Sequence, residues 1–141
     1  MTIELANLER ETFESLDVLV DTGATFTKAP ATMLNRLGVM VERTAESELA
    51  NGATVTREIG IAAIRLQGQE FLTPVIFGGP GERPLLGVIA LEHALLAVDP
   101  VAGRLVPTRL LELQETVPQQ KQPEGQDRCI AQPQPDERGL K

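Results

Sequence analysis

The sequence contains no tryptophan and no tyrosine, and only four phenylalanines among its 141 residues. Hydrophobic residues nevertheless make up 42% of the chain, which is enough for a globular body with a modest core. With so few aromatic side chains, that core must be built mainly from Leu, Ile, Val and Ala.

Cysteine and histidine are also scarce, with one residue of each, Cys129 and His93. A single cysteine excludes an internal disulfide framework, and one histidine with scattered acidic residues does not make the usual ligand set of a zinc site. A Ser-His or Cys-His catalytic centre would need His93, but no nucleophile motif accompanies it, and we expect it on a helix surface. A phosphate-binding glycine loop is missing as well, so we expect no metal and no cofactor.

Long apolar runs and an excess of positive charge are missing too. No segment approaches the roughly 18 apolar residues of a membrane-spanning helix, and the first ten residues, with Glu4 and Glu9, do not resemble a signal peptide. The net charge of −7 argues against nucleic acid and anionic membranes as partners, and fits a basic substrate or partner better. We therefore expect a soluble cytoplasmic protein that binds neither nucleic acid nor membrane.

The composition of the chain changes at Val117. Residues 117–141 contain four prolines and six glutamines and few large apolar side chains, so they cannot bury enough surface to offset the entropy of ordering. We predict a disordered tail at 117–141, whose alternative role is a short linear binding motif, and one folded domain at 1–116.

Most of this domain shows β-strand patterns. Residues 2–6 alternate between apolar and polar, and residues 13–21 become continuously apolar, as in a strand that enters the interior. Asn51-Gly52 predicts a hairpin. A further strand is predicted at 69–77, broken by Pro74, which indicates an edge or a bend. Further β patterns occupy 39–41, 47–49, 54–64 and 104–106. Helices are predicted at 30–37, which Gly38 would end, and at 88–96.

The triplet Asp21-Thr22-Gly23 follows the apolar run 18–20 and occurs once in the chain. A carboxylate at the end of a buried strand is costly to ionise unless it is hydrogen-bonded or shares a proton. The threonine can bond to a neighbouring strand, and the glycine allows another backbone to approach closely. Because Asp, Thr and Gly are also common turn residues, the triplet alone predicts either a capped turn or a catalytic carboxylate.

Two further segments favour the catalytic interpretation. An apolar strand with Asp-Thr-Gly-Ala at 21–24 is followed by Ala-Asn-Gly-Ala at 50–53 and Pro-Leu-Leu-Gly at 84–87. In these elements, over residues 1–110, the chain resembles the retropepsin-like (retroviral-type) aspartic proteases, and residues 85–107 look like the bacterial members of this group. The resemblance implies an all-β acid-protease fold with one or two short helices, a closed or partly closed β-barrel with one lobe per chain.

The same resemblance assigns roles to the residues of the first segment. Asp21 would be the catalytic aspartate, and Thr22 would bond across a dimer to hold two such loops together. Gly23 would offer its carbonyl to the substrate backbone, and Ala24 would complete the active-site loop.

The other two segments also match elements of the family. The hairpin would be a flap that closes over bound peptide, formed by Ala50, Asn51 and Gly52. The later apolar segment would pack behind the catalytic loop through Leu85, Leu86 and Gly87. Viral members commonly have an acidic residue after the alanine and an arginine after the second glycine, whereas this chain has Thr25 and Val88.

One Asp-Thr-Gly per chain implies that the second carboxylate comes from another copy, because aspartic proteases use two. The remaining aspartates do not repeat the motif: Asp17, Asp99, Asp127 and Asp136. We therefore expect a homodimer, joined partly by residues 2–6 and 104–113, that hydrolyses an extended peptide. The alternative is a dimerising or peptide-binding module of the same fold with little or no turnover.

Overall fold

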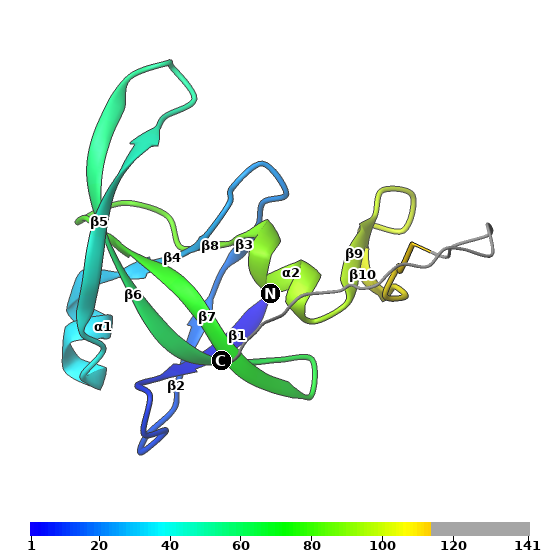
Figure 1. Ribbon diagram of the computed structural model, residues 1–141, viewed down its shortest axis with the longest axis horizontal. Helices are drawn as coiled ribbons and strands as arrows, with labels where there is room; N and C mark the ends of the chain where they lie inside the picture. The colour runs from blue at the N-terminus through cyan, green and yellow to red at the C-terminus, as the bar shows by residue number, and fades with distance from the viewer. Residues whose placement is uncertain (114–141) are drawn as a thin grey trace, which may run out of the picture. The chain divides into compact units, whose positions relative to one another are not determined.

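The computed structural model describes residues 1–113, so the tail predicted at 117–141 lies outside the described residues. In chain order the elements are β1 (Thr2–Ala6), β2 (Glu14–Asp17), β3 (Leu19–Val20), β4 (Thr27–Pro30), α1 (Ala31–Leu37), β5 (Val41–Glu48), β6 (Thr54–Leu66), β7 (Gln69–Gly78), β8 (Leu85–Leu86), α2 (Val88–His93), β9 (Leu96–Asp99) and β10 (Arg104–Pro107). Within this part the chain is mostly β-structure with two short helices, as the sequence predicts (Figure 1). Neither of these helices has the length and apolar character needed to cross a membrane.

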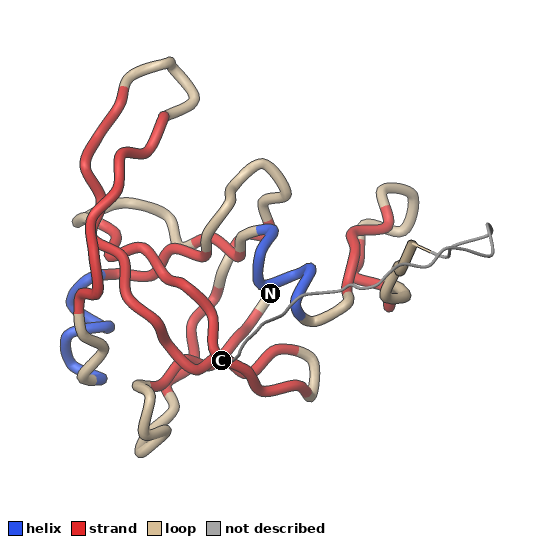
Figure 2. Tube along the Cα trace, in the orientation of Figure 1, coloured by secondary structure: helices blue, strands red, loops and turns tan. Residues whose placement is uncertain are grey.

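The main sheet of residues 1–113 has eight strands in the order β2-β1-β6-β7-β4-β8-β3, with β5 paired to β6. Figure 2 shows the strands of this part of the chain in red. The two ends of this order are consecutive in the chain, because β2 ends at Asp17 and β3 begins at Leu19. Between them Val18 is buried and donates its N–H to the Met1 carbonyl at 2.8 Å. One extended segment thus reaches both ends of the sheet, which is a partly closed barrel. The single strand predicted at 13–21 is divided at Val18.

The core is aliphatic, as the shortage of aromatic residues requires. Its fully buried large apolar side chains come from β1, β6, β7 and β8 and from both helices: Ile3, Leu5, Leu34, Ile64, Leu66, Val75, Leu86 and Leu91. Helix α1 follows Pro30 and ends at Gly38, whose φ of 88° is the left-handed conformation that glycine adopts readily. The helix predicted at 30–37 is therefore confirmed.

The second helix is shorter than the sequence pattern indicates. It covers Val88–His93 and not 88–96, because Leu95 has a φ of 57° and Leu96 already pairs in β9. His93 is exposed, as expected, and its ring stacks on Phe71 with the centroids 4.5 Å apart.

Strand β7 runs through Pro74 without a break. It pairs with β6 from Ile76 back to Gln69, whereas its pairing with β4 begins only at Val75. Pro74 therefore lies where β7 has one neighbour, which is where a residue without an N–H is tolerated. The edge prediction at this residue is confirmed.

Strands β5 and β6 form a hairpin that projects beyond the rest of the sheet (Figure 1). The strand segments predicted at 39–41 and 47–49 overlap the two ends of one strand, β5, which begins at Val41 and ends at Glu48. At the tip, Leu49 donates its N–H to the Ala53 carbonyl at 2.7 Å, and Gly52 donates to Leu49 at 2.9 Å. Only Gly52 has a positive φ, while the Asn51 side chain accepts from Ala53 N–H. The hairpin is confirmed, but its loop is longer than a two-residue Asn-Gly turn.

Strands β1 and β10 lie in the two segments expected to join a second chain, and they differ in whether a backbone edge is free to pair. Strand β1 pairs with β2 on one side and with β6 on the other, so a second chain could not extend the sheet at β1. Strand β10 pairs with β9 alone within residues 1–113. The β9–β10 hairpin therefore keeps the free backbone edges that a partner strand needs.

Candidate active site

The loop that carries Asp21 spans 21–26 and connects β3 to β4. These two strands do not pair with each other, because β8 lies between them. Strand β8 is parallel to β3, with Leu19 opposite Leu85, and antiparallel to β4, with Lys28 opposite Leu85. The loop therefore bends around the end of β8.

Backbone hydrogen bonds fasten this loop to the segment that leaves β8. Asp21 donates its N–H to the Leu86 carbonyl at 3.0 Å, and Val88 donates to Ala24 at 2.7 Å. A third bond runs from Ile89 N–H to the Thr25 carbonyl at 3.1 Å. Main-chain bonds therefore connect the segment that contains Thr25 with the segment that contains Val88.

Gly87 and Thr27 complete this attachment in the interior. The Gly87 N–H donates to Thr27 Oγ1 at 3.1 Å, and Thr27 is fully buried. A Cβ atom on Gly87 would lie 2.4 Å from the Phe26 carbonyl carbon and 2.8 Å from Thr27 N, closer than atoms can approach. Only glycine fits at position 87, which gives a physical reason for the Leu-Leu-Gly pattern.

The Asp21 side chain is half-buried and is held by its own loop. Asp21 Oδ1 accepts the Gly23 N–H at 2.9 Å, and the backbone carbonyl of Asp21 accepts the Ala24 N–H at 3.1 Å. Gly23 passes close to the carboxylate, since an added Cβ would lie 3.3 Å from Oδ1. Thr22 and Gly23 are exposed, so this side of the loop is open for contact with another molecule.

Asp21 lies in a groove of about 880 Å³, which we call the Asp21 groove. One wall is the loop, with Gly23, Ala24, Thr25 and Phe26; the other is the β5 side of the hairpin, from residue 45 to 50. The floor consists of sheet residues that share one face: Lys28, Arg57, Ile59, Ile76 and Leu85. Figure 1 shows the loop and the hairpin projecting on the same side of the sheet.

The predicted site residues divide between this groove and its surroundings. Asp21, Gly23, Ala24, Ala50 and Leu85 line it. The hairpin-tip residues Asn51 and Gly52 lie beyond its lining and are exposed. Leu86 and Gly87 are buried, and the Leu86 carbonyl accepts the Asp21 N–H of the loop.

A charged cluster beside the groove was not predicted from the sequence. Arg57 binds Glu82 with both terminal nitrogens, each at 2.9 Å, and Gly79 donates its N–H to Glu82 Oε1 at 2.9 Å. Lys28 lies 3.8 Å from the same oxygen. The Arg57 hydrogen bonds, then the Gly79 N–H and the charge of Lys28, lower the pKa of Glu82 to about 2. The cluster ties loop 79–82 to the base of the hairpin.

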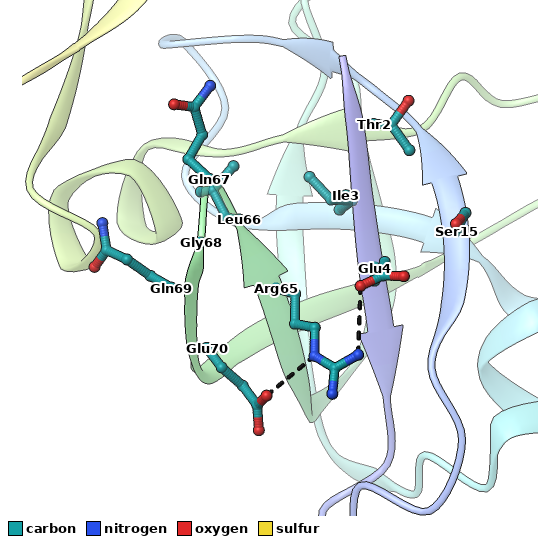
Figure 3. Close-up of a pocket in the computed structure, with 10 residues that line it drawn as sticks. All are labelled: Thr2, Ile3, Glu4, Ser15, Arg65, Leu66, Gln67, Gly68, Gln69 and Glu70. Atoms are coloured by element: carbon teal, nitrogen blue, oxygen red, sulfur yellow. Dashed lines mark hydrogen bonds and ion pairs between the residues drawn. The ribbon is translucent and has the colours of Figure 1, made fainter.

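A second concavity is lined by residues of β1 and β2 and by the β6–β7 turn with its flanking residues, and Asp21 is not among them (Figure 3). Its polar centre is Arg65, which contacts Glu4 at 3.5 Å and Glu70 at 3.1 Å. The dashed lines in Figure 3 show that these acids already occupy the guanidinium group. Among residues 1–113 no three His, Cys, Asp or Glu side chains gather as metal ligands.

Comparisons with known proteins relate this geometry to one family. The profile of the family described as "gag-polyprotein putative aspartyl protease" matches residues 13–93, which include the Asp21 loop, the hairpin and β8. No curated protein matches the chain.

Several solved structures are similar to the chain. The solution structure of simian foamy virus (mac) protease is 18% identical, with a TM-score of 0.46, and the match covers 65% of this chain and 92% of that one. EIAV protease complexed with the inhibitor HBY-793 is 20% identical, with a TM-score of 0.47 and coverage of 75% and 89%. A foamy viral protease-reverse transcriptase in complex with an RNA/DNA hybrid is 14% identical, with a TM-score of 0.48, over 84% of this chain and 13% of that one.

Proposed function

The chain belongs to the gag-polyprotein putative aspartyl protease family, and from this we propose that it is an aspartic endopeptidase that acts as a homodimer. Each chain supplies one Asp21, and the two carboxylates meet across a two-fold axis. The substrate is a peptide or protein segment held extended in the Asp21 groove, and no cofactor takes part.

The proposed reaction needs the two carboxylates in different protonation states. The ionised Asp21 takes a proton from a water molecule, whose oxygen forms a bond to the carbon of the scissile carbonyl. The protonated Asp21 of the other copy donates its proton to the carbonyl oxygen. The proton taken from water then passes to the amide nitrogen as the C–N bond breaks. One hydroxyl proton of the intermediate returns to the Asp21 that had donated its proton, and a carboxylic acid and an amine leave.

The observation that carries this proposal is the placement of Asp21. Its loop is fastened at both ends by backbone bonds to residues 86–89, and its carboxylate opens into the groove under a projecting hairpin. A hydrolytic site requires a catalytic group held in place by its surroundings and a cover that excludes water. The exposed Thr22 and Gly23 leave room for a second loop to approach.

The deciding experiment compares the wild type with Asp21→Asn on a generic peptide library between pH 4 and 7. We expect the substitution to lower kcat/KM by about 10⁴-fold or more while the melting temperature and the dimer persist. Mixed dimers of the two chains should also be inactive, because one carboxylate cannot act as both acid and base. Wild-type cleavage by Asp21→Asn would refute the role of this residue.

The dimer is tested separately by sedimentation at about 10 to 100 μM, a range that detects a weak interface. A monomer at all these concentrations would contradict the proposal. A dimer that binds peptides but never cleaves them would support the alternative, a binding module on the same fold.

A further inference from the structure

The floor of the Asp21 groove carries charge opposite in sign to the whole chain. The chain has a net charge of −7, yet the charged residues on the floor are Lys28 and Arg57. Strand pairing places Lys28 opposite Leu85 on one side and Ile76 on the other, and Ile76 lies opposite Ile59. Lys28 is therefore a cation between apolar neighbours.

The two cations share one acid. Glu82 uses both carboxylate oxygens on Arg57, and one of them also accepts the Gly79 N–H. The Lys28 ammonium lies 3.8 Å from Glu82, beyond hydrogen-bond distance, and makes no hydrogen bond within residues 1–113. The Lys28 and Arg57 side chains are only 18% and 13% exposed, so the unbalanced charge is poorly screened by water.

The positive charge is confined to the floor. Glu46 and Glu48 line the groove from the hairpin side, and Asp21 lies on the loop side. A peptide in the groove therefore meets acids on both walls and a cation beneath. This arrangement favours an acidic side chain only where that side chain points to the floor.

We propose that Lys28 determines specificity by binding the carboxylate of one Asp or Glu side chain of the peptide, beside the apolar surface of Ile59, Ile76 and Leu85. The proposal rests on the proposed function, since it names a preference of that same groove. A carboxylate would give the Lys28 ammonium the charge-assisted hydrogen bond that Glu82 does not supply. A preference for an acidic side chain at one position follows, although the chain as a whole is acidic.

The test uses peptide mixtures in which each position in turn is Glu, Gln or Lys and the others are varied. For the wild type, kcat/KM for Glu should exceed that for Gln by about tenfold at one position relative to the scissile bond. Lys28→Gln should bring this ratio close to one, and Lys28→Glu should favour Lys over Gln at the same position. Equal cleavage of Glu and Gln at every position, or an unchanged ratio in Lys28→Gln, overturns the proposal.

Arg36→Gln is the matched control. It also removes one positive charge, but Arg36 lies on α1, is paired with Glu14 and does not line the groove. For Arg36→Gln, the ratio of kcat/KM for Glu peptides to kcat/KM for Gln peptides should equal that of the wild type. Loss of the preference in this variant would show that net charge, and not Lys28, is responsible.

Binding separates this proposal from the protease assignment. The same mixtures are incubated with Asp21→Asn, and the bound peptides are identified by mass spectrometry. Enrichment of Glu peptides over Gln peptides at one position supports the Lys28 preference even if the wild type cleaves nothing. This enrichment should be lost in the double variant that combines Asp21→Asn with Lys28→Gln. Equal recovery of the Glu and Gln peptides refutes the Lys28 preference even if cleavage is confirmed.

Discussion

Two buried threonines of the sheet have opposite hydrogen-bonding environments. Thr27 Oγ1 accepts the buried Gly87 N–H at 3.1 Å, whereas Thr73 Oγ1 is buried without a partner within the described part of the chain. Replacing each by valine keeps the shape and removes the hydroxyl. Thr27→Val should lower the free energy of unfolding by about 1–3 kcal/mol, because it leaves the Gly87 N–H unsatisfied. Thr73→Val should raise it by up to about 1 kcal/mol, because a buried unpaired hydroxyl is lost.

Urea unfolding of both variants measures the two effects, and each variant serves as the control of the other. Equal destabilisation would show that both hydroxyls are bonded. A further readout is cleavage, which Thr27→Val should also reduce, since Thr27 anchors the segment that holds the Asp21 loop.

Some residues of the site could be predicted from the sequence and others could not. Asp21, Gly23 and Gly87 belong to short motifs, so their neighbourhood along the chain was informative. Arg57 and Glu82 belong to no motif, and they meet only because loop 79–82 folds back to β6. Lys28 likewise joins the groove through strand pairing that no local pattern encodes. Their roles, like those of the predicted residues, stay predictions until variants are measured.

At the scale of elements, the hairpin of β5 and β6 is the proposed cover of the groove. Gly52 at its tip has a φ of 88°, and Gly68 in the turn between β6 and β7 has a φ of 80°. Neither has an atom within 4 Å of an added Cβ, so valine at either position strains the backbone without a clash. Each substitution should cost about 1–2 kcal/mol of stability.

Their effects on activity should differ. Gly52→Val should lower kcat/KM by about ten- to a hundredfold, because a distorted tip misplaces the cover over the peptide. Gly68→Val should leave it near the wild-type value, since Gly68 lines the separate concavity in Figure 3. Parallel measurement of melting temperature and cleavage decides; equal loss of activity in both variants would show that strain alone matters.

The elements themselves were predicted well where the pattern is local. Alternation predicted β1, and Pro30 and Gly38 marked the ends of α1. The errors occurred where tertiary pairing decides. The sequence of residues 88–96 continues the helical pattern, but Leu96 pairs with Pro107 of β10. Because of this pairing, α2 ends before Leu96. Similarly, the segment 13–21 is divided because its two halves pair with different strands.

At the scale of the whole molecule, Glu82 makes stability depend on acid pH. Its pKa is lowered from 4.5 to about 2 in the fold, so its contribution is present above pH 4.5 and is lost as pH falls towards 2. Glu82→Gln should be less stable than the wild type at pH 7 by about 1–2 kcal/mol, since the 34% exposed side chain is partly screened. The difference should shrink to near zero at pH 2.

Thermal unfolding of both proteins from pH 7 to pH 2 gives this difference directly. Glu92→Gln is the control, because Glu92 is exposed on α2 and forms no ion pair within residues 1–113. A gap between wild type and Glu82→Gln that stays constant with pH would show that the ion pair with Arg57 contributes nothing.

Strand β8 lies between two strands that are close neighbours in sequence, and this has a consequence for the order of folding. β3 and β4 are separated only by residues 21–26, yet β3 has no strand partner until Leu85 and Leu86 arrive, and until then β4 can pair with β7 alone. Such long-range parallel pairing forms late, because a long loop must close first. During synthesis the Asp21 loop is therefore made early and shaped late. A chain interrupted before Leu85 carries the whole Asp-Thr-Gly triplet without the backbone bonds to residues 86–89 that fasten its loop.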